Sequence, residues 1–446
     1  MNETFERWQS RRAFILAVTG AAVGLGNIWR FPYMTGENGG SAFLLLYIVF
    51  VLLLGLPMMM AEIMIGRAGR RSPMQALAFL SEEAGVTPHW RWLGLFGAIT
   101  TFFILSFYSV VSGWSIEYLI GSVNGDFVAQ SAPQIGASFD AFLLDPLRMT
   151  FNHTLFMLLT MSVVAVGIKS GLEKLNNVMM PLLYLILLVL GGYAVTTDGF
   201  GEAIRWLFTP DLSAINLSVV LNAMGHAFFT LAVGACALMA YGAYMPSDQS
   251  LPKAVLAVAL LDIAVALLSG IAIFSVVFSH GLDPTEGPGL MFVTLPVAFS
   301  ELPGGQIWLG AFFMLLLVAT WTSSINLAEP MVAMLVGRGW RRGRAAALIG
   351  SLVWLVGLLS VLSFSSLKDV HWLGDMNFFA LVTTVPPDIF LPIGGLLIAV
   401  FAAWQMPKEA AASALGVSPA GFAVWQVVVR YISIPLTAVV LLSSVI

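Results

Sequence analysis

Apolar residues of this chain gather in long runs, and polar residues are concentrated in the short intervals between the runs. An α-helix needs about 20 apolar residues to cross the hydrocarbon core of a bilayer. The runs predict eleven membrane-spanning helices, at residues 12–35, 41–65, 92–121, 152–168, 176–197, 214–244, 253–280, 306–336, 345–365, 377–404 and 421–445. The expected fold class is therefore an all-α polytopic membrane protein embedded in a lipid bilayer.

The composition agrees with a membrane protein and excludes a soluble one. Of the 446 residues, 59% are hydrophobic and only 10% are charged, which is far from the composition of a soluble domain. The longest polar interval, residues 123–150, is too short to bury a core, so residues 1–446 are expected to form one membrane domain. The single cysteine, Cys236, excludes a disulfide framework and a cysteine-rich metal site. No nucleic-acid partner is expected.

Basic residues are sorted between alternate intervals. Of the 20 lysines and arginines, 15 lie in the intervals 1–12, 66–92, 169–174, 246–253, 337–344 and 405–420. Basic loops face the cytoplasm, so the N-terminus is predicted to be cytoplasmic, and an odd number of helices places the C-terminus outside. The expected location is the inner (plasma) membrane of the cell.

The first apolar run is interrupted in its middle. Gly20, Gly24 and Gly26 weaken the helix, Pro32 removes a backbone donor, and Asn27 brings polarity into the run. Hydrocarbon cannot satisfy the backbone groups that a break frees, so a break survives where it lines an enclosed cavity and meets an ion or a substrate. The first run therefore indicates a transport site.

The sixth run carries a second interruption, Thr230–Gly234, five runs after the first. Two broken helices at matching positions of two five-helix halves are typical of transporters built from a 5+5 inverted repeat. The repeats are expected at about 10–197 and about 200–404. The extra helix, at about 421–445, lies outside this symmetry and is expected to be peripheral.

Several longer motifs occur in a specific order along the chain. They are Ala21-Ala-Val-Gly-Leu-Gly-Asn-Ile-Trp-Arg-Phe-Pro-Tyr33, Glu37-Asn-Gly-Gly40, Gly55-Leu-Pro57, Glu62-Ile-Met-Ile-Gly-Arg67, Gly171-Leu-Glu-Lys174, Phe228-Phe-Thr-Leu231, Thr322-Ser-Ser324 and Leu391-Pro-Ile-Gly-Gly395. In these motifs the chain resembles the neurotransmitter:sodium symporter family, whose members have the leucine-transporter fold. The resemblance covers essentially the whole chain.

The resemblance implies a sodium-coupled secondary active symporter that imports an amino acid by alternating access, as a monomer or a weak dimer. Helices 1, 2, 6 and 7 would rock against helices 3, 4, 8 and 9. An intramembrane enzyme is disfavoured, because the five histidines are scattered along the chain and no nucleophile accompanies them in a catalytic arrangement. A channel would not need two broken helices in inverted halves. A sensor that shares the fold without transporting stays open as an alternative.

The resemblance also implies two sodium sites built from hard oxygen ligands. The first would use the Ala22 carbonyl with the side chains of Asn27, Thr230 and Asp262. The second would use the carbonyls of Gly20, Val23 and Ala319 with the hydroxyls of Thr322 and Ser323. On residue types alone, hydrogen bonding of these two hydroxyls back to their own helix is an equally good interpretation.

Asp262 stands where many family members carry asparagine. An aspartate at mid-membrane costs roughly 2.5–3.5 kcal/mol, and an adjacent sodium ion would offset that cost. As a fixed negative charge, Asp262 would replace the chloride that many relatives need, so we predict sodium dependence without chloride dependence. Proton antiport through Asp262 or Glu62 is a weaker alternative. Glu62 is better interpreted as a buried acid that hydrogen-bonds the broken helices.

The resemblance places the carboxylate of the substrate at the backbone amides of Leu25 and Gly26 and at the Tyr108 hydroxyl, since free N–H groups at a half-helix form an anion cradle. Tyr108 and Phe229 would form a lid. Carbonyl acceptors for the ammonium group would come from Ala22, Phe229 and Thr230.

The side-chain pocket would be lined by Ile104, Ala232, Ala235, Ser323 and Leu327. Ala235 stands where some relatives have a bulky residue, so a roomy pocket is expected, suited to a large hydrophobic or aromatic side chain. Ala21 and Ala232 lack the polar side chains that some members offer to the ammonium group. An amino-acid-like carboxylate whose amine is displaced or absent is therefore the alternative substrate.

Both gates of the family depart from the usual pattern. Arg30 matches the outer-gate arginine, but Thr383 stands at the position of its acidic partner, which leaves Asp375 and Asp388 as candidate substitutes. At the inner gate Trp8 matches, whereas Phe5 and Gly337 replace the usual basic and acidic pair. A different inner latch is therefore expected, with Arg7 or Arg11 as candidates.

Overall fold

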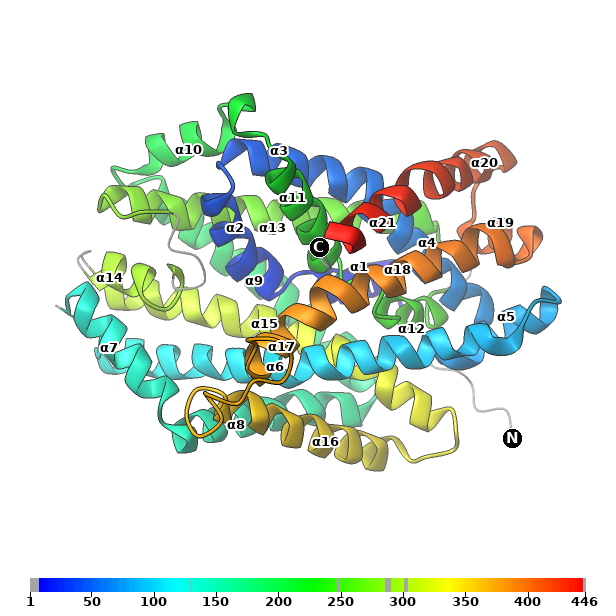
Figure 1. The fold of residues 1–446 in the computed structure, drawn as a ribbon, viewed down its shortest axis with the longest axis horizontal. Helices are drawn as coiled ribbons and strands as arrows, with labels where there is room; N and C mark the ends of the chain where they lie inside the picture. The colour runs from blue at the N-terminus through cyan, green and yellow to red at the C-terminus, as the bar shows by residue number, and fades with distance from the viewer. Residues whose placement is uncertain (1–7, 129, 247–248, 285–289, 301–303, 444–446) are drawn as a thin grey trace.

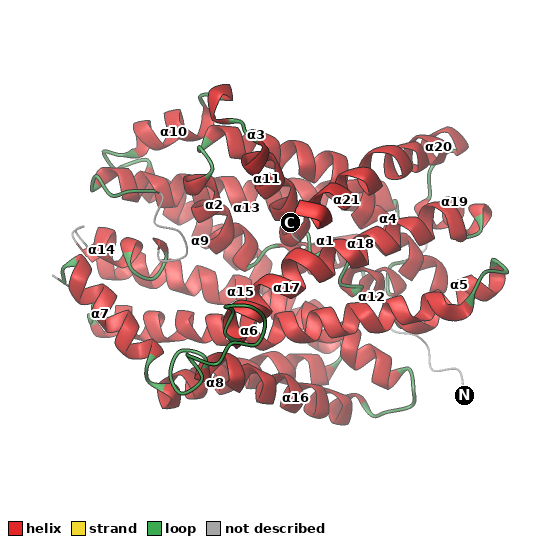
Figure 2. Ribbon diagram, viewed as in Figure 1, coloured by secondary structure: helices red, strands yellow, loops and turns green. Residues whose placement is uncertain are grey.

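Figure 1 shows a computed structural model of the chain, which describes residues 8–128, 130–246, 249–284, 290–300 and 304–443. Helices joined by loops make up these residues, and no strand is found among them (Figure 2). The expected all-α fold class is therefore confirmed. Phe5 and Arg7, which were expected to bear on the inner gate, lie outside the described residues.

Helices long and apolar enough to cross a membrane account for ten of the expected segments. Among the described residues, nine are single spans, at Ser41–Gly69, Pro88–Asn124, Pro146–Val166, Ile168–Ala194, Leu251–Ser279, Gly305–Val336, Arg342–Leu362, Phe378–Gln405 and Pro419–Leu442. The tenth is a bent pair, Arg11–Ala22 and Gly26–Glu37, whose two parts meet at 51°. The sixth expected segment, 214–244, is divided between two shorter helices, α11 (Leu217–Thr230) and α12 (Ala237–Ala243).

Most spans run roughly parallel to the long axis of the molecule (Figure 1). At its centre α6 (Arg91–Asn124) and α15 (Gly305–Val336) pack against each other. Short helices lie at the two ends: α7 (Ala132–Leu143), α10 (Phe200–Phe208) and α14 (Thr294–Ser300) at one, α5 (Pro73–Glu83) and α19 (Lys408–Leu415) at the other (Figure 1). The polar interval 123–150 thus contains α7, which the sequence pattern did not predict.

Several spans widen by a single π-turn just before a proline. Five π-turns of the described chain end two residues before Pro32, Pro57, Pro392, Pro407 and Pro435: η1 (Gly26–Arg30), η2 (Val51–Gly55), η7 (Pro386–Phe390), η8 (Phe401–Gln405) and η9 (Val429–Ser433). Proline lacks an N–H, so the carbonyl four residues earlier loses its helical partner. A π-turn is one of the local adjustments by which a membrane helix tolerates this loss.

Candidate functional site

The first span is broken where its glycines cluster. α1 (Arg11–Ala22) ends, Val23 adopts an extended backbone conformation, and helical turns resume in η1 at Gly26. The position of this break agrees with the sequence prediction. The backbone between the two half-helices is consequently free to bond groups other than its own helix.

Gly24 lies at the centre of this break. A Cβ atom at Gly24 would lie 2.4 Å from the Tyr108 hydroxyl and 2.5 Å from Ser323 Oγ, so any other residue here would displace one of these groups. The adjacent Leu25 N–H donates a hydrogen bond of 3.2 Å to the Tyr108 hydroxyl. The Leu25 amide was expected to be free for the substrate carboxylate. It is instead hydrogen-bonded to Tyr108, the side chain that was expected to bind the same carboxylate.

The sixth span is broken between α11 and α12. Ala232, Gly234 and Cys236 in this break have φ angles of 50°, 97° and 58°. Such left-handed conformations cost roughly 1–2 kcal/mol for a residue with a Cβ atom. A Cβ atom at Gly234 would also lie 2.1 Å from the Leu391 carbonyl oxygen. The break is thus a fixed feature that surrounding contacts hold in place.

Glu62 supplies much of that support. This residue of α4 (Leu56–Gly69) is fully buried, and its carboxylate accepts hydrogen bonds from the backbone N–H groups of Gly234 at 2.9 Å, Leu238 at 3.1 Å and Met239 at 3.4 Å. These amides belong to the break and to the first turn of α12, which have no helical partners. The interpretation of Glu62 as a buried structural acid agrees with this geometry.

Asp262, fully buried on α13 (Leu251–Ser279), collects the side chains expected at the first sodium site. Its carboxylate accepts hydrogen bonds from Asn27 Nδ2 at 2.7 Å and from Thr230 Oγ1 at 3.1 Å. Tyr47 also donates its hydroxyl to Asp262, at 2.8 Å. Three of the four predicted residues therefore meet, and the fourth, Ala22, lines the adjacent cavity. Tyr47 was not predicted, because a tyrosine in an apolar run looks like ordinary packing.

Ser323 on α15 gathers the residues expected at the second sodium site. Its hydroxyl lies within hydrogen-bonding distance of the carbonyl oxygens of Val23 at 2.7 Å, Gly20 at 3.1 Å and Ala319 at 3.1 Å. One hydroxyl proton satisfies one of these oxygens at a time, so the others remain available to a cation. The Thr322 hydroxyl instead donates within its own helix, at 3.0 Å to Ala319, as the alternative interpretation held.

Asn176 lies beside this second cluster and was missed from the sequence. It is fully buried on α9 (Lys174–Ala194), and its Nδ2 donates to the Leu172 carbonyl at 2.9 Å. Its Oδ1 is buried without a hydrogen-bond partner in the described part of the chain. A Cβ atom at Gly20 would lie 2.4 Å from this oxygen. An asparagine within an apolar run was the signal that could have identified it.

A small cavity of about 40 Å³ lies between the two breaks. Its lining residues are Ala21, Ala22, Gly24, Leu25, Gly26, Ile104, Tyr108, Phe229, Ala232, Ala235, Ser323, Leu327 and Leu391. This set contains every predicted substrate residue except Thr230, which points to Asp262 instead. The cavity holds a few water molecules at most, so the expectation of a roomy pocket is wrong for this conformation. Large side chains from several helices converge on it.

Arg30 packs against Phe229, one of the residues that line this cavity. Its Nη2 lies 3.0 Å from Asp388 Oδ1, and its guanidinium lies 4.7 Å from the centre of the Phe229 ring. Of the two candidate acids, Asp388 is thus the partner, whereas Asp375 is exposed in a loop. Thr383 donates its hydroxyl to the Phe379 carbonyl of its own helix. Asp388 lies in η7, where the π-turn alters the regular helical register from which position 383 was counted.

Trp8 is packed against the end of the sixth span. Its side chain is 2% exposed, its Nε1 donates to the Tyr241 carbonyl at 3.3 Å, and its backbone N–H donates to the Tyr244 carbonyl at 3.1 Å. The Trp8 ring meets both tyrosine rings edge-on. Arg11, one candidate for the inner latch, is exposed. Trp8 therefore joins the start of α1 to the end of the sixth span.

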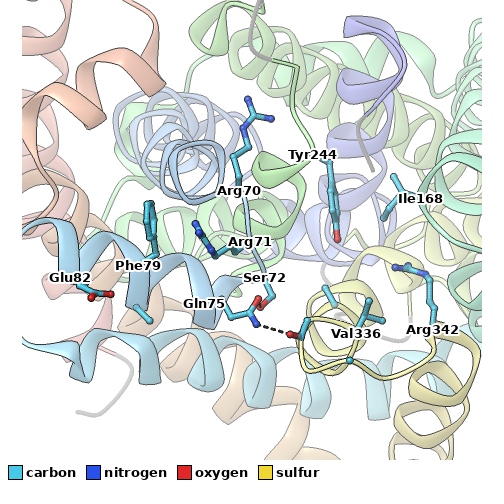
Figure 3. A pocket seen from close by; sticks show the side chains of 14 residues that line it. Arg70, Arg71, Ser72, Gln75, Phe79, Glu82, Ile168, Tyr244, Val336 and Arg342 are labelled. Carbon is cyan, nitrogen blue, oxygen red and sulfur yellow. Dashed lines mark hydrogen bonds between the residues drawn. The ribbon is translucent and has the colours of Figure 1, made fainter. Parts of the chain in front are cut away.

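A buried ion pair lies near Trp8 and was not predicted. Glu329, fully buried on α15, pairs with Arg342 and accepts a hydrogen bond of 3.0 Å from the Tyr244 hydroxyl. Tyr244 and Arg342 line a cavity of about 980 Å³ at this end, where Gln75 donates to the Gly337 carbonyl at 2.8 Å (Figure 3). A glutamate inside the apolar run 306–336 was the available signal.

Comparison with known proteins agrees with this arrangement. The model of the sodium:neurotransmitter symporter family matches residues 5–135 and 134–446. The chain belongs to this family. It is 35% identical to an uncharacterized sodium-dependent transporter, YhdH, of Bacillus subtilis, over 99% of this chain and 97% of the relative. An uncharacterized sodium-dependent transporter of Haemophilus influenzae is 31% identical, over 92% of this chain and 91% of its own.

A solved structure is also similar along nearly the full length. It is that of MhsT in complex with L-phenylalanine, with a TM-score of 0.90, 40% sequence identity, and coverage of 98% of this chain and 99% of MhsT. As a member of the sodium:neurotransmitter symporter family, the protein is a sodium-dependent, multi-pass membrane transporter of a small molecule. The resemblance given by its motifs is thereby confirmed.

Proposed function

We propose that this symporter imports an amino acid with a large hydrophobic or aromatic side chain, coupled to two sodium ions and without chloride. The observation that carries the proposal is the hydrogen bond of 3.2 Å between the Leu25 amide and the Tyr108 hydroxyl at the cavity between the breaks. A substrate carboxylate can accept from both groups, and from the Gly26 amide, because the half-helix that begins there presents free N–H donors.

The two clusters of oxygen atoms fit sodium. Carboxylate, amide, hydroxyl and carbonyl oxygens are hard ligands of the kind that alkali and alkaline-earth cations prefer. The proposed ligands of the first ion are Ala22, Asn27, Thr230 and Asp262, and those of the second are Gly20, Val23, Ala319, Thr322 and Ser323. The first ion would replace the hydrogen bond from Asn27 to Asp262, and the second would turn the Ser323 hydroxyl proton away from the carbonyls.

Chloride is not required in this proposal, because Asp262 already supplies a negative charge. The carboxylate is fully buried and is held by donors from three different spans, at Asn27, Tyr47 and Thr230. An anion from solution would be repelled from this position. Sodium beside Asp262 gives a neutral pair, which lowers the cost of crossing the membrane.

The side chain of the substrate would lie against Ile104, Ala232, Ala235 and Leu327. The cavity of about 40 Å³ must widen to accept it, which requires the lid residue Phe229 to move. The similar structure, MhsT, binds L-phenylalanine, and this supports an aromatic substrate. Ala21 and Ala232 offer no polar side chain to the ammonium group, so an amine-free carboxylate is the competing substrate.

Two sets of contacts, around Arg30 and around Trp8, support alternating access. Arg30, Asp388, Tyr108 and Phe229 would form the outer gate. Trp8 would form the inner gate, together with the Glu329 ion pair. With the N-terminus in the cytoplasm and the C-terminus outside, the Trp8 end faces the cytoplasm. We place the protein in the plasma membrane as a monomer or a weak dimer, with the inverted repeats at about residues 10–197 and 200–404.

Uptake into proteoliposomes tests the proposal. Labelled aromatic, branched and small amino acids, γ-amino acids and amine-free carboxylates are each supplied with an inward gradient of sodium chloride, sodium gluconate or choline chloride. Accumulation of aromatic or branched amino acids in both sodium salts, and none in choline, is the expected result. Preference for an amine-free substrate would overturn the amino-acid assignment. Binding without accumulation would indicate a sensor.

A further inference from the structure

The eleventh helix, which the sequence predicts to be peripheral, makes hydrogen bonds with the main chain of two other spans. It comprises α20 (Pro419–Val428), η9 (Val429–Ser433) and α21 (Ile434–Ser443). It packs against the second span at η2 and α4, and against the tenth span at α18 (Leu391–Val400). Polar side chains along this helix point to particular carbonyl oxygens of both neighbours.

The first of these oxygens is the carbonyl of Ala403 in the tenth span. It lies in the last turn of that span, which ends at Gln405 before the extended Met406, so no further helical N–H follows to bond it. Gln426 Nε2 donates to this oxygen at 2.9 Å, and Arg430 Nε donates to it at 3.1 Å. The Arg430 guanidinium also lies 5.1 Å from the centre of the Trp404 ring. A membrane-embedded arginine is thus directed at one backbone oxygen that the end of the helix has left free.

The second oxygen is the carbonyl of Leu53 in the second span. Its regular partner would be the N–H of residue 57, which is again proline. Ser433 donates its hydroxyl to this oxygen at 3.1 Å. One turn away, Trp425 Nε1 donates to the Pro57 carbonyl at 3.1 Å. The same helix therefore supplies donors to carbonyls of two spans that lack a helical N–H partner, in a lipid bilayer that offers no donors of its own.

The tenth span also bears a gate residue. Asp388 lies near its other end and pairs with Arg30 of the first span at 3.0 Å. These contacts connect four spans in series. Ser433 joins the eleventh helix to the second span, and Arg430 joins it to the tenth. Asp388 then joins the tenth span to the first. The first and second spans belong to the group that moves in the proposed alternating access.

We propose that the eleventh helix is a strap that makes the tenth span move together with the second, with Arg430, Gln426 and Ser433 as its positioning residues. The inference rests on the proposed alternating-access function. Without the strap, Asp388 would not stay in register with Arg30 as the first two spans rock. Transport would slow, whereas the cavity, which none of the three residues touches, would still bind its ligands.

Variants of the eleventh helix test this coupling. The double variant Arg430→Ala/Gln426→Ala removes both side-chain donors to Ala403, whereas Gln426→Ala alone keeps the Arg430 donor to the same oxygen. Spin labels at exposed positions Leu52 and Leu397 report the distance between the second and tenth spans, with little background because Cys236 is buried. Val427→Ala, at an exposed position of the same helix, is the matched control.

In the parent protein and in the control, the labelled pair should keep one narrow distance distribution in sodium and in choline. Gln426→Ala alone should behave as the parent, and in the double variant sodium-dependent ligand binding should match the parent. The distance should nevertheless broaden or shift between the two salts, and uptake should be reduced at least about fivefold. Ser433→Ala, which removes a single neutral hydrogen bond at the other attachment, should change the distance in the same way.

Two results would overturn the strap. One is a double variant that keeps the uptake and the narrow distance of the parent, since the two donors would then not couple the spans. The other is Ser433→Ala with an unchanged distance in both salts. Because the distance does not depend on substrate, a parent protein without sodium-driven uptake would refute the proposed function while the distances still decide on the strap.

Discussion

Asn27, in the half-helix after the first break, donates a hydrogen bond of 2.7 Å to the carboxylate of Asp262 on the seventh span. This contact ties the broken helix to the carboxylate that the proposed first sodium ion would share. Tyr47 and Thr230 donate to the same carboxylate, so its negative charge is oriented before any ion arrives. A cation that enters between Asn27 and Asp262 must compete with this hydrogen bond and with a second one, of 3.2 Å, from the same Asn27 Nδ2 to the Asp262 backbone carbonyl.

Asp262→Asn should weaken sodium dependence and create a response to chloride. Loss of the charged ligand is expected to raise the sodium concentration for half-maximal uptake at least about tenfold, and chloride should then stimulate uptake because the fixed charge is gone. Uptake measured against sodium concentration in gluconate and in chloride checks this. Asp198→Asn, at an exposed position, is the control. Unchanged sodium affinity would remove Asp262 from the ion site.

Gly24→Ala should weaken substrate binding. The new methyl group would lie 2.4 Å from the Tyr108 hydroxyl and 2.5 Å from Ser323 Oγ, so both must shift, at a cost of about 1–3 kcal/mol. Equilibrium binding of labelled phenylalanine in sodium chloride should fall by at least about tenfold. Gly192→Ala, where nothing lies within 4 Å of the added atom, should bind normally. Normal binding by the Gly24 variant would contradict the site.

Asp388→Asn should loosen the outer gate without destroying the site. The pair with Arg30 is partly exposed, with side-chain exposures of 18% and 32%, so its loss is expected to cost only about 1 kcal/mol. Labelling from outside of a cysteine placed at Phe229 should therefore become roughly fivefold faster. Asp375→Asn, in an exposed loop, should leave the rate unchanged. If both variants behave alike, Asp388 is not a gate residue.

Glu329→Gln should favour opening at the Trp8 end. Removal of the carboxylate from a buried pair with Arg342 is strongly destabilising, by about 3–5 kcal/mol in comparable cases, and the conformation that exposes the pair to water escapes this cost. A cysteine introduced at Tyr241 should then be labelled faster from the cytoplasmic side. Glu82→Gln lines the same cavity and should have no such effect. Equal labelling rates would exclude the ion pair from the inner gate.

Backbone chemistry explains which parts of this molecule could be predicted from its sequence. Runs of apolar residues locate the spans. Gly24 and Gly26 locate the first break because glycine is a poor helix former, and a Cβ atom at Gly24 would also collide with Tyr108 and Ser323. Asp388 could be predicted only as one of two candidate partners of Arg30, because the π-turn η7 changes the helical register from which the partner's position is counted. The donor Tyr47 could not be predicted, because its role depends on a tertiary contact with Asp262.

Two polar residues inside apolar runs were missed as candidate site residues. Glu329 and Asn176 are both fully buried, and either could have been singled out by polarity alone. The small size of the cavity could not have been predicted from the sequence, because it depends on the conformation of Phe229. The role of the eleventh helix could not be predicted either, since it requires knowledge of which carbonyls lie beside Arg430 and Ser433.

Simultaneous flux of sodium and substrate tests the central claim most directly. Proteoliposomes in sodium gluconate, free of chloride, receive labelled phenylalanine together with radioactive sodium, and both are counted over time. Accumulation of phenylalanine against its gradient, with sodium entering in a fixed ratio to it, is the predicted result. Sodium entry that is the same with and without phenylalanine, or uptake that appears only when chloride is added, would contradict the account.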